Sequence, residues 1–431
     1  MTLGIMAKDR ESRDAMTIVI AGGVVVALSF GVRSVFGGIV EPVSRDLFGG
    51  RIEVFSLAIA IQNLVWGLAQ PAFGAVADKW GDRLALWLGL GCYGLGLAVC
   101  VTGTTPLAQH LGTGLLVGMG ISGTAFGVVL AVVGRAAPPD KRSAYLGLTS
   151  ALGSVGQVIL PLAVSQLVEW FDWRVVMIIV AGMLAPMALC IPRLRTAAAP
   201  PNGTSNATPP VSLSQTLRHA LTQPSYLLLG LGFFVCGFHL AFITAHLPNF
   251  VEHFCVGTAM SPEELRAFGL RALALVGLAN IAGTLLASHL GTLFPKPYVL
   301  AAIYGLRSVV LILFISQPVT PLSVMVFALA MGILWLSTVP LTSALVLVMF
   351  GPRAMGTLFG IVFLSHQLGG FAGVWIGGAY FDSFGDYDAI WYASILLGLL
   401  SAGLHLCVKE REIPTRVSGP GYPARRTEAA R

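Results

Sequence analysis

Charged residues are scarce in this sequence. Asp, Glu, Lys and Arg together make up 11% of its 431 residues, whereas apolar residues make up 55%. An ordinary soluble domain has about a quarter of its residues charged, so the composition excludes a soluble globular protein. The six cysteines do not indicate a disulfide framework either, because five of them fall within long apolar runs and only Cys255 lies outside them.

Long apolar runs recur along nearly the whole chain. Each run has about 20 residues or more, enough to cross a hydrocarbon core of ~30 Å as a helix. The sequence therefore predicts an all-α membrane protein with twelve transmembrane helices, near residues 16–40, 55–77, 84–104, 107–133, 143–167, 173–191, 225–250, 268–290, 298–316, 322–349, 355–380 and 389–408.

The distribution of positive charge indicates the topology. Most Lys and Arg residues fall on one side of the membrane if both termini are placed in the cytoplasm, as the positive-inside rule requires. We therefore expect a multi-pass protein of the cell inner (cytoplasmic) membrane with cytoplasmic termini. The net charge of +6 is spread over loops and a tail instead of forming a stripe, so nucleic acid is not an expected partner.

A stretch rich in Pro, Ala, Ser and Thr separates the sixth apolar run from the seventh, which predicts a linker between two halves. The expected organisation is an N-terminal cytoplasmic tail at 1–15, a six-helix half at 16–191, a cytoplasmic linker at 192–224, a second six-helix half at 225–408 and a C-terminal cytoplasmic tail at 409–431.

The two halves resemble each other, as in transporter folds built from internal repeats. The segment SFGVRSVFGG in the first run aligns with VCGFHLAFIT in the seventh, and GMGI in the fourth aligns with AMGI in the tenth. The order of matches is the same across four pairs of runs. The aligned residues include Gly31 with Gly237, Arg33 with His239, Asn63 with Asn280, Gly74 with Gly291, and Gly156 with Gly369.

The decapeptide GAVADKWGDR follows the second run. Gly74 and Gly81 allow a tight turn. Asp78 is suited to the positive N-terminus of a helix, whereas Lys79 and Arg83 are suited to carbonyl ends. We therefore expect the segment to latch helix ends together and to take part in gating; the alternative is an ordinary charged turn.

Together with the twelve runs and the central linker, this decapeptide resembles the signature of the major facilitator superfamily over roughly residues 16–410. The resemblance implies two pseudo-symmetric six-helix halves and secondary transport. It also implies a central cavity lined by the first and seventh helices, with Arg33 and His239 on opposite sides. The second-half copy GTLFPKP has Pro295 in place of the acid, which assigns the latch to the first half.

Segments of the ninth to eleventh runs, such as IYGLRSVVL and FGIVFLSHQLGG, resemble bacterial relatives of the monocarboxylate transporters and the oxalate/formate exchangers. Those families often carry an arginine in the eighth span, where this chain has Asn280. The resemblance implies a carboxylate substrate, and this departure weakens that implication.

The polar residues at membrane depth are basic or neutral, and no Asp or Glu lies among them. A guanidinium binds a carboxylate through two hydrogen bonds, and His, Asn and Gln add further donors. The set therefore favours an anionic small-molecule substrate. The candidate substrate-binding residues are Arg33, Asn63, His239, His246, Asn280, Arg307, His366 and Gln367.

Each candidate also has a structural interpretation, because a polar residue in a span often only bonds a neighbouring helix. For Arg307 we give equal weight to two roles, substrate contact and helix packing. Without a buried acid, coupling to protons would run through a histidine or the substrate's own proton. We expect a monomer in the lipid bilayer with no cofactor and no metal site.

Two other functions compete with anion transport. The same fold could carry a metal or another solute through histidine ligands, although no His pair occurs at i, i+4. A non-transporting membrane sensor or an enzyme is the third class. The sequence offers no soluble domain and no constellation of acid, base and nucleophile for it.

The predicted topology leaves Cys255 as the one cysteine in an outer loop. We expect a membrane-impermeant maleimide to label intact cells through this thiol, and Cys255→Ser to remove most of the labelling. A water-filled outward cavity could expose Cys236 as well. Unchanged labelling of the Cys255→Ser variant would contradict the assigned topology.

Overall fold

The structure is a computed structural model that describes residues 2–194, 213–352 and 354–413. The first half contains α1 (Thr2–Val35), η1 (Phe36–Ile39), α2 (Val40–Phe48), α3 (Ile52–Trp80), α4 (Asp82–Thr102), α5 (Pro106–Gln109), η2 (His110–Leu116), α6 (Val117–Thr124), α7 (Phe126–Ala136), α8 (Arg142–Trp170), α9 (Trp173–Gly182), α10 (Leu184–Cys190) and η3 (Ile191–Arg193). The second contains α11 (Leu213–Ala220), α12 (Pro224–Phe254), α13 (Pro262–Leu293), α14 (Lys296–Ile315), α15 (Pro321–Leu334), α16 (Thr338–Phe350), α17 (Met355–Phe384) and α18 (Asp388–Leu406).

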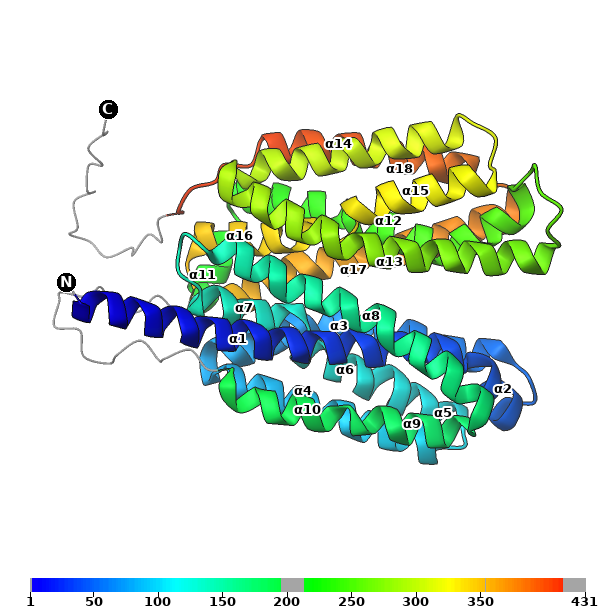
Figure 1. Cartoon of the computed structure of the whole chain (residues 1–431), viewed down its shortest axis with the longest axis horizontal. Helices are drawn as coiled ribbons and strands as arrows, with labels where there is room; N and C mark the ends of the chain where they lie inside the picture. Colours follow the sequence, from blue (N-terminus) through cyan, green and yellow to red (C-terminus); the bar gives the residue numbers. More distant parts are fainter. Residues whose placement is uncertain (1, 195–212, 353, 414–431) are drawn as a thin grey trace.

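Twelve helical segments of the described chain are long and apolar enough to span a membrane, from Asp14–Ile39 to Asp388–Leu406. The prediction of twelve spans is confirmed. Figure 1 shows them as two groups side by side, α1 to α10 below and α12 to α18 above. We call the end where α1 begins and α18 ends the terminal side, and the other end, near α2, the opposite side. Most of the expected linker and C-terminal tail lies outside the described residues, whereas α1 already begins at Thr2 in the expected N-terminal tail.

Large apolar side chains cover the outside of the helices. Leu95 in α4, Leu313 in α14 and Leu396 in α18 are each more than half exposed in the isolated chain. Helices satisfy their own backbone hydrogen bonds, so only such side chains need to face hydrocarbon. The exposed leucines therefore mark the surface that lipid covers.

The internal repeat is visible in the closest helix contacts. In the first half α1 packs against α8, and in the second half α12 packs against α17. A Cβ added to Gly156 in α8 would lie 1.8 Å from the carbonyl oxygen of Ala27 in α1. A Cβ added to the aligned residue Gly369 in α17 would lie 1.9 Å from the carbonyl oxygen of Phe234 in α12. The aligned glycines thus serve the same close contact in each half, and the two pseudo-symmetric halves are confirmed.

The fourth and tenth spans are interrupted, a feature that the sequence analysis missed. In the fourth span α6 ends at Thr124 and α7 begins at Phe126, with Ala125 in an extended conformation. In the tenth, α15 ends at Leu334 and α16 begins at Thr338. These breaks coincide when GMGI is aligned with AMGI. Part of the cause in the tenth span is Pro340, whose ring nitrogen cannot donate to the carbonyl of the preceding turn.

The halves contact each other mainly through two helix pairs, α3 with α17 and α8 with α13. A Cβ on Gly74 in α3 would lie 2.3 Å from the carbonyl oxygen of Gly356 in α17. In the other pair, Asn280 Nδ2 donates to Ser154 Oγ at 2.7 Å. These residues belong to the portions of their helices between the middle and the terminal side. The halves therefore meet at the terminal side in this structure.

On the opposite side, α2 is tied to α9 by an ion pair. Asp46 accepts hydrogen bonds from Arg174 Nη1 at 2.5 Å and from Trp173 Nε1 at 3.1 Å. The bond from Arg174, followed by that from Trp173, lowers the pKa of Asp46 from its ordinary value. The ion pair therefore stabilises the fold at pH values above the ordinary pKa of an aspartate. It loses its effect as the pH falls through the lowered pKa. Because Asp46 is 44% exposed, its contribution is at most about 1 kcal/mol.

The contact between α1 and α8 predicts a large effect of a single methyl group. We expect Gly156→Ala to lower the melting temperature of the purified protein, because overpacking of this kind costs about 1–3 kcal/mol. Gly305→Ala in α14 is the control, since a Cβ there would meet nothing within 4 Å. Equal melting temperatures for the two variants would contradict the proposed packing.

Candidate functional site

Arg33 lies near the end of α1, with its side chain partly exposed. Its Nη2 donates to Asn63 Oδ1 in α3 at 2.5 Å, and its guanidinium lies 4.9 Å from the ring centre of Trp66. Asn63 is held in turn by a bond from its Nδ2 to the Ile59 carbonyl at 3.0 Å. Among the described residues, Nε of Arg33 is buried with no hydrogen-bond partner. The guanidinium is thus fixed in place while it keeps unused donor capacity.

No ion pair joins Arg33 to a carboxylate among the side chains that the structure describes. A guanidinium at this depth is costly without a partner or water. The hydrogen bond to Asn63 and the cation–π contact with Trp66 offset part of that cost, but neither partner carries a negative charge. The described side chains around Arg33 therefore leave its positive charge uncompensated.

Gln367 brings the second half to the same place. It lies in α17, and its Nε2 donates to the Asn63 carbonyl oxygen at 3.2 Å. Gly67 makes the approach possible, because a Cβ there would lie 2.6 Å from Gln367 Cβ. Gln367 Oε1 also lies 3.1 Å from Nδ1 of His366. Four of the predicted residues, Arg33, Asn63, His366 and Gln367, therefore belong to one chain of contacts across the two halves.

An aromatic layer continues from Trp66 through the interior of both halves. Phe30 contacts Trp66 and Phe126 with ring centres 5.5 and 4.5 Å apart, and Trp66 contacts Phe363 of the second half at 4.9 Å. These four rings, Phe30, Trp66, Phe126 and Phe363, are all at least nine-tenths buried. Of these contacts, the one between Trp66 and Phe363 joins the two halves, next to Arg33.

His239 was expected opposite Arg33, but the structure places it inside the second half. Its side chain is fully buried, and Nε2 lies 2.8 Å from the Ser394 carbonyl oxygen in α18. Asn280, also buried, accepts a bond from the Leu336 amide at 2.8 Å and thus stabilises the break between α15 and α16. Both side chains therefore bond other parts of the protein interior, and neither bonds Arg33 in the described part of the chain.

His246 and Arg307 also bond neighbouring helices. His246 Nε2 lies 3.0 Å from the Val374 carbonyl oxygen, and its Nδ1 lies 3.2 Å from the Tyr387 hydroxyl, on the opposite side. Arg307 is fully buried and donates from Nε and Nη2 to the Leu334 carbonyl oxygen at 3.1 and 2.6 Å. Of its two expected roles, the contacts of Arg307 match helix packing, and they are explained by the helix break that the sequence analysis missed.

The described residues contain no group of three or more His, Cys, Asp or Glu side chains able to hold a metal ion. The three span histidines contact different neighbours. His239 contacts α18, His246 contacts α17 and the loop after it, and His366 contacts Gln367. The three imidazoles therefore do not converge on one point.

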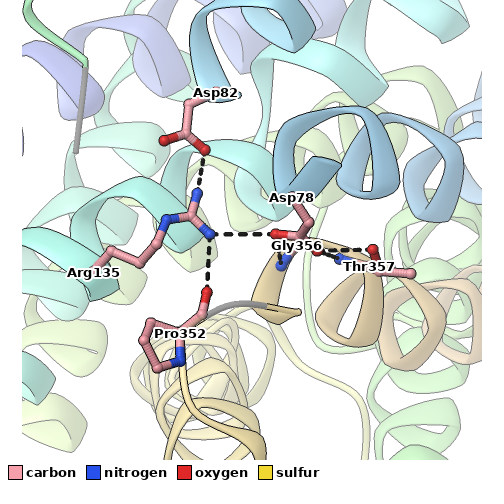
Figure 2. Close-up of polar contacts among 6 residues, drawn as sticks. All are labelled: Asp78, Asp82, Arg135, Pro352, Gly356 and Thr357. Carbon is pink, nitrogen blue, oxygen red and sulfur yellow. Dashed lines mark hydrogen bonds and ion pairs between the residues drawn. The ribbon is translucent and has the colours of Figure 1, made fainter. Parts of the chain in front are cut away.

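Figure 2 shows the contacts of Asp78 at the terminal side. Its Oδ2 accepts bonds from the amide and the hydroxyl of Thr357, both at 2.7 Å, and its Oδ1 accepts one from the Gly356 amide at 3.2 Å. These amides belong to the first turn of α17, where the helix dipole is positive. A buried acid of the first half thus caps a helix of the second half.

Arg135 completes this arrangement, and the sequence analysis missed it. Its Nη1 donates to Asp78 Oδ1 at 3.3 Å and to the Pro352 carbonyl oxygen at 3.2 Å, while its Nη2 pairs with Asp82. The sequence shows only that Arg135 is a basic residue in the last turn of the fourth span. It is far from the decapeptide along the chain and approaches it only in the folded structure. We call the set of Asp78, Asp82, Arg135, Pro352, Gly356 and Thr357 the terminal latch.

The other residues of the decapeptide support the latch or face outward. Gly74 allows the backbone of α3 to reach Gly356, and Gly81 has φ 103°, a conformation that favours glycine. Arg83 Nη2 donates to the carbonyl oxygen of Pro192 near the end of the sixth span. Lys79 lies over the Trp80 ring at 4.6 Å.

Comparisons with known proteins agree with this architecture. The model of the Major Facilitator Superfamily matches residues 22–262, more than half of the chain. The uncharacterized MFS-type transporter YcxA of Bacillus subtilis (strain 168) is 24% identical over 380 residues, which cover 84% of this chain and 87% of YcxA.

Two solved structures of FucP share the fold, one of them described as the E. coli fucose:proton symporter. A variant matches with a TM-score of 0.69 and 14% identity, and the protein in an outward conformation matches with a TM-score of 0.66 and 14% identity. Each match covers 91% of this chain and 99% of FucP. With twelve spans in two repeated halves and the latch after the second span, the chain belongs to the major facilitator superfamily.

Proposed function

We propose that this protein is a secondary transporter that moves a small organic anion, a carboxylate, across the cytoplasmic membrane by alternating access. The observation that carries the proposal is the partly exposed guanidinium of Arg33, held between the halves with no carboxylate partner among the described side chains. A carboxylate can accept two parallel bonds from it. In this account the substrate is the missing counter-ion.

Gln367 and His366 are the second-half residues of the proposed site. Gln367 contacts the backbone of Asn63 across the interface of the halves, so a rocking motion changes the distance between Gln367 and Arg33. Such a site is rebuilt each time the halves close, as expected of a site at a repeat interface. FucP is by its name a fucose symporter; its likeness here concerns the fold, and the charge of Arg33 favours an anion over a neutral sugar.

The terminal latch gives the proposed cycle two distinct states. In the described state Asp78 and Arg135 hold the halves together at the terminal side, which we assign to the cytoplasm. In this account the aromatic layer also blocks the path between Arg33 and the terminal side. The proposed substrate therefore reaches Arg33 from the outside. Release of the latch and separation of Trp66 from Phe363 would open the inward path.

Histidine-mediated transport of a metal gains no support from the described residues, because the three span histidines do not converge. A non-transporting sensor shares the fold, and uptake into proteoliposomes separates it from a transporter. The substrate class is narrowed by a thermal-shift screen of mono- and dicarboxylates, aromatic acids included, with fucose as a neutral comparison.

Neutralising Asp78 should separate turnover from binding. Asp78→Asn weakens the cap of α17 without touching the proposed substrate site, so it biases the two-state equilibrium. We expect turnover in proteoliposomes to fall strongly while equilibrium affinity changes less than about tenfold, or roughly 1.4 kcal/mol. Asp46→Asn, which breaks an exposed ion pair on the opposite side, is the control. Transport by Asp78→Asn at the rate of the control would rule out the latch.

Arg33 is tested by charge and by shape. Arg33→Lys keeps the charge but loses the planar fork, so we expect at least tenfold weaker binding, about 1.4 kcal/mol. Arg33→Ala should abolish uptake of the carboxylate found in the screen, with a near-normal melting temperature because no described acid is stranded. Arg174→Ala, which removes an exposed arginine, should transport normally.

A helix-packing role for Arg33 predicts a different pattern. Both Arg33 variants would then insert poorly and melt early, because the bond to Asn63 has gone. Normal insertion of Arg33→Ala combined with uptake at near wild-type affinity would refute the assigned anion site.

A further inference from the structure

A cluster of polar side chains lies in the interior of the second half, where α12, α14, α16 and α17 meet. At its centre is Cys236 of α12, which is fully buried. Its Sγ lies 3.7 Å from Arg307 Nη2 and 3.2 Å from Thr338 Oγ1, and the His366 side chain lies beside it. Polar groups from three different helices, α14, α16 and α17, therefore face one sulfur atom.

Arg307 gives this cluster an uncompensated positive charge. The guanidinium is fully buried and donates to the Leu334 and Trp335 carbonyl oxygens at the end of α15, which supply only partial negative charge. No carboxylate forms an ion pair with it in the described part of the chain, and its Nη1 is buried there without a hydrogen-bond partner. A buried charge of this kind requires a counter-charge or a bound ligand.

The titratable neighbours limit what that counter-charge can be. Besides Cys236 they are Tyr304 of α14, His239 of α12, His366 of α17 and His405 of α18. Histidine is neutral or positive, so only the thiol and the phenol can become anions. In water the thiol is the more acidic of the two by about 1.5 pKa units. A thiolate is therefore the available partner for Arg307.

His366 offers a route for the thiol proton. Its Nδ1 faces Gln367 Oε1 at 3.1 Å, and Gln367 Nε2 donates to the Asn63 carbonyl, so the proton of the neutral imidazole lies on Nδ1. Its Nε2 is then an acceptor, and this atom is buried without a partner among the described residues. The imidazole thus lies between the sulfur and the contacts of Arg33.

We infer that Cys236 and His366 form a proton-binding site next to Arg307. The S–H bond of Cys236 breaks, its proton forms an N–H bond at His366 Nε2, and the resulting thiolate pairs with the guanidinium. The imidazolium then gives up a proton at the interface of the halves and becomes neutral. One proton is released in total, no group is oxidised or reduced, and the charge of the cluster falls from +1 to zero.

The role of this site rests on the proposed function. Because Gln367 contacts both His366 and the backbone of Asn63, binding of an anion at Arg33 and the proton on His366 share one connection. The site would then hold the coupling proton.

The proton site can be tested without any substrate. The full chain is purified with every cysteine except Cys236 changed to alanine, and the ultraviolet absorbance of the thiolate is recorded as the pH is varied. A protein that retains only Cys100 is the matched control. That thiol is equally buried, and the side chain it contacts, Thr113, is neutral.

We expect one equivalent of thiolate at neutral pH in the Cys236 protein and none in the Cys100 protein. Arg307→Gln should abolish the neutral-pH signal. Because Arg307 also binds the end of α15 and this variant could fold poorly, Thr338→Val provides a second test that removes the hydroxyl beside Sγ and keeps the shape of the side chain. We expect this variant to reduce the signal at an unchanged melting temperature.

A thiolate that appears only in alkaline solution, together with that of the Cys100 protein, would overturn the inference. So would a neutral-pH signal that neither Arg307→Gln nor Thr338→Val alters. Both outcomes leave the carboxylate uptake assigned to Arg33 unaffected, so failure of the proton site is distinguishable from failure of the proposed function.

Discussion

The bond between Asp78 and the first turn of α17 is the interaction on which the arrangement of the two halves depends. A single buried carboxylate satisfies two backbone amides and a hydroxyl of the other half. Arg135 compensates its charge and at the same time binds Asp82 and the Pro352 carbonyl. The bonds to Gly356, Thr357 and Pro352 cross between the halves, so they break when the halves separate at the terminal side. That property suits a two-state element whose equilibrium a ligand can bias.

The site next to Arg33 follows from this closure. With the terminal side held shut, α3 and α17 approach closely enough for Gln367 to reach Asn63 and for Trp66 to contact Phe363. The guanidinium is fixed by Asn63 and Trp66 and remains partly exposed. In the second half the aligned position is occupied by His239, which turns inward to α18. The two halves therefore share a backbone fold but differ in chemistry: the arginine of the proposed anion site belongs to the first half, and the proposed proton site lies in the second.

The sequence was sufficient to predict the twelve spans and the two repeated halves, because apolar length and charge asymmetry are properties of the chain alone. It was also sufficient to expect an acid of the decapeptide at a helix N-terminus. It could not predict Arg135 as a partner of Asp78, because the two are separated by two spans. The break at Ala125 could not be predicted, because no proline lies next to it in the sequence. The break before Thr338 was also missed, and without it the sequence offered no partner for a buried Arg307. Side-chain direction around a helix, which sends His239 to α18, is likewise decided by neighbouring helices.

The most direct test of this account is a distance measurement between the halves at the terminal side. Trp80 of α3 and Phe294, which follows α13, are 60% and 56% exposed, so spin labels on Trp80→Cys and Phe294→Cys in a chain without other cysteines should be tolerated. We expect a dominant short distance in the protein with Asp78 intact, and a longer second population when Asp78→Asn is added. Identical distance distributions with and without Asp78→Asn would contradict the claim that this carboxylate holds the halves together.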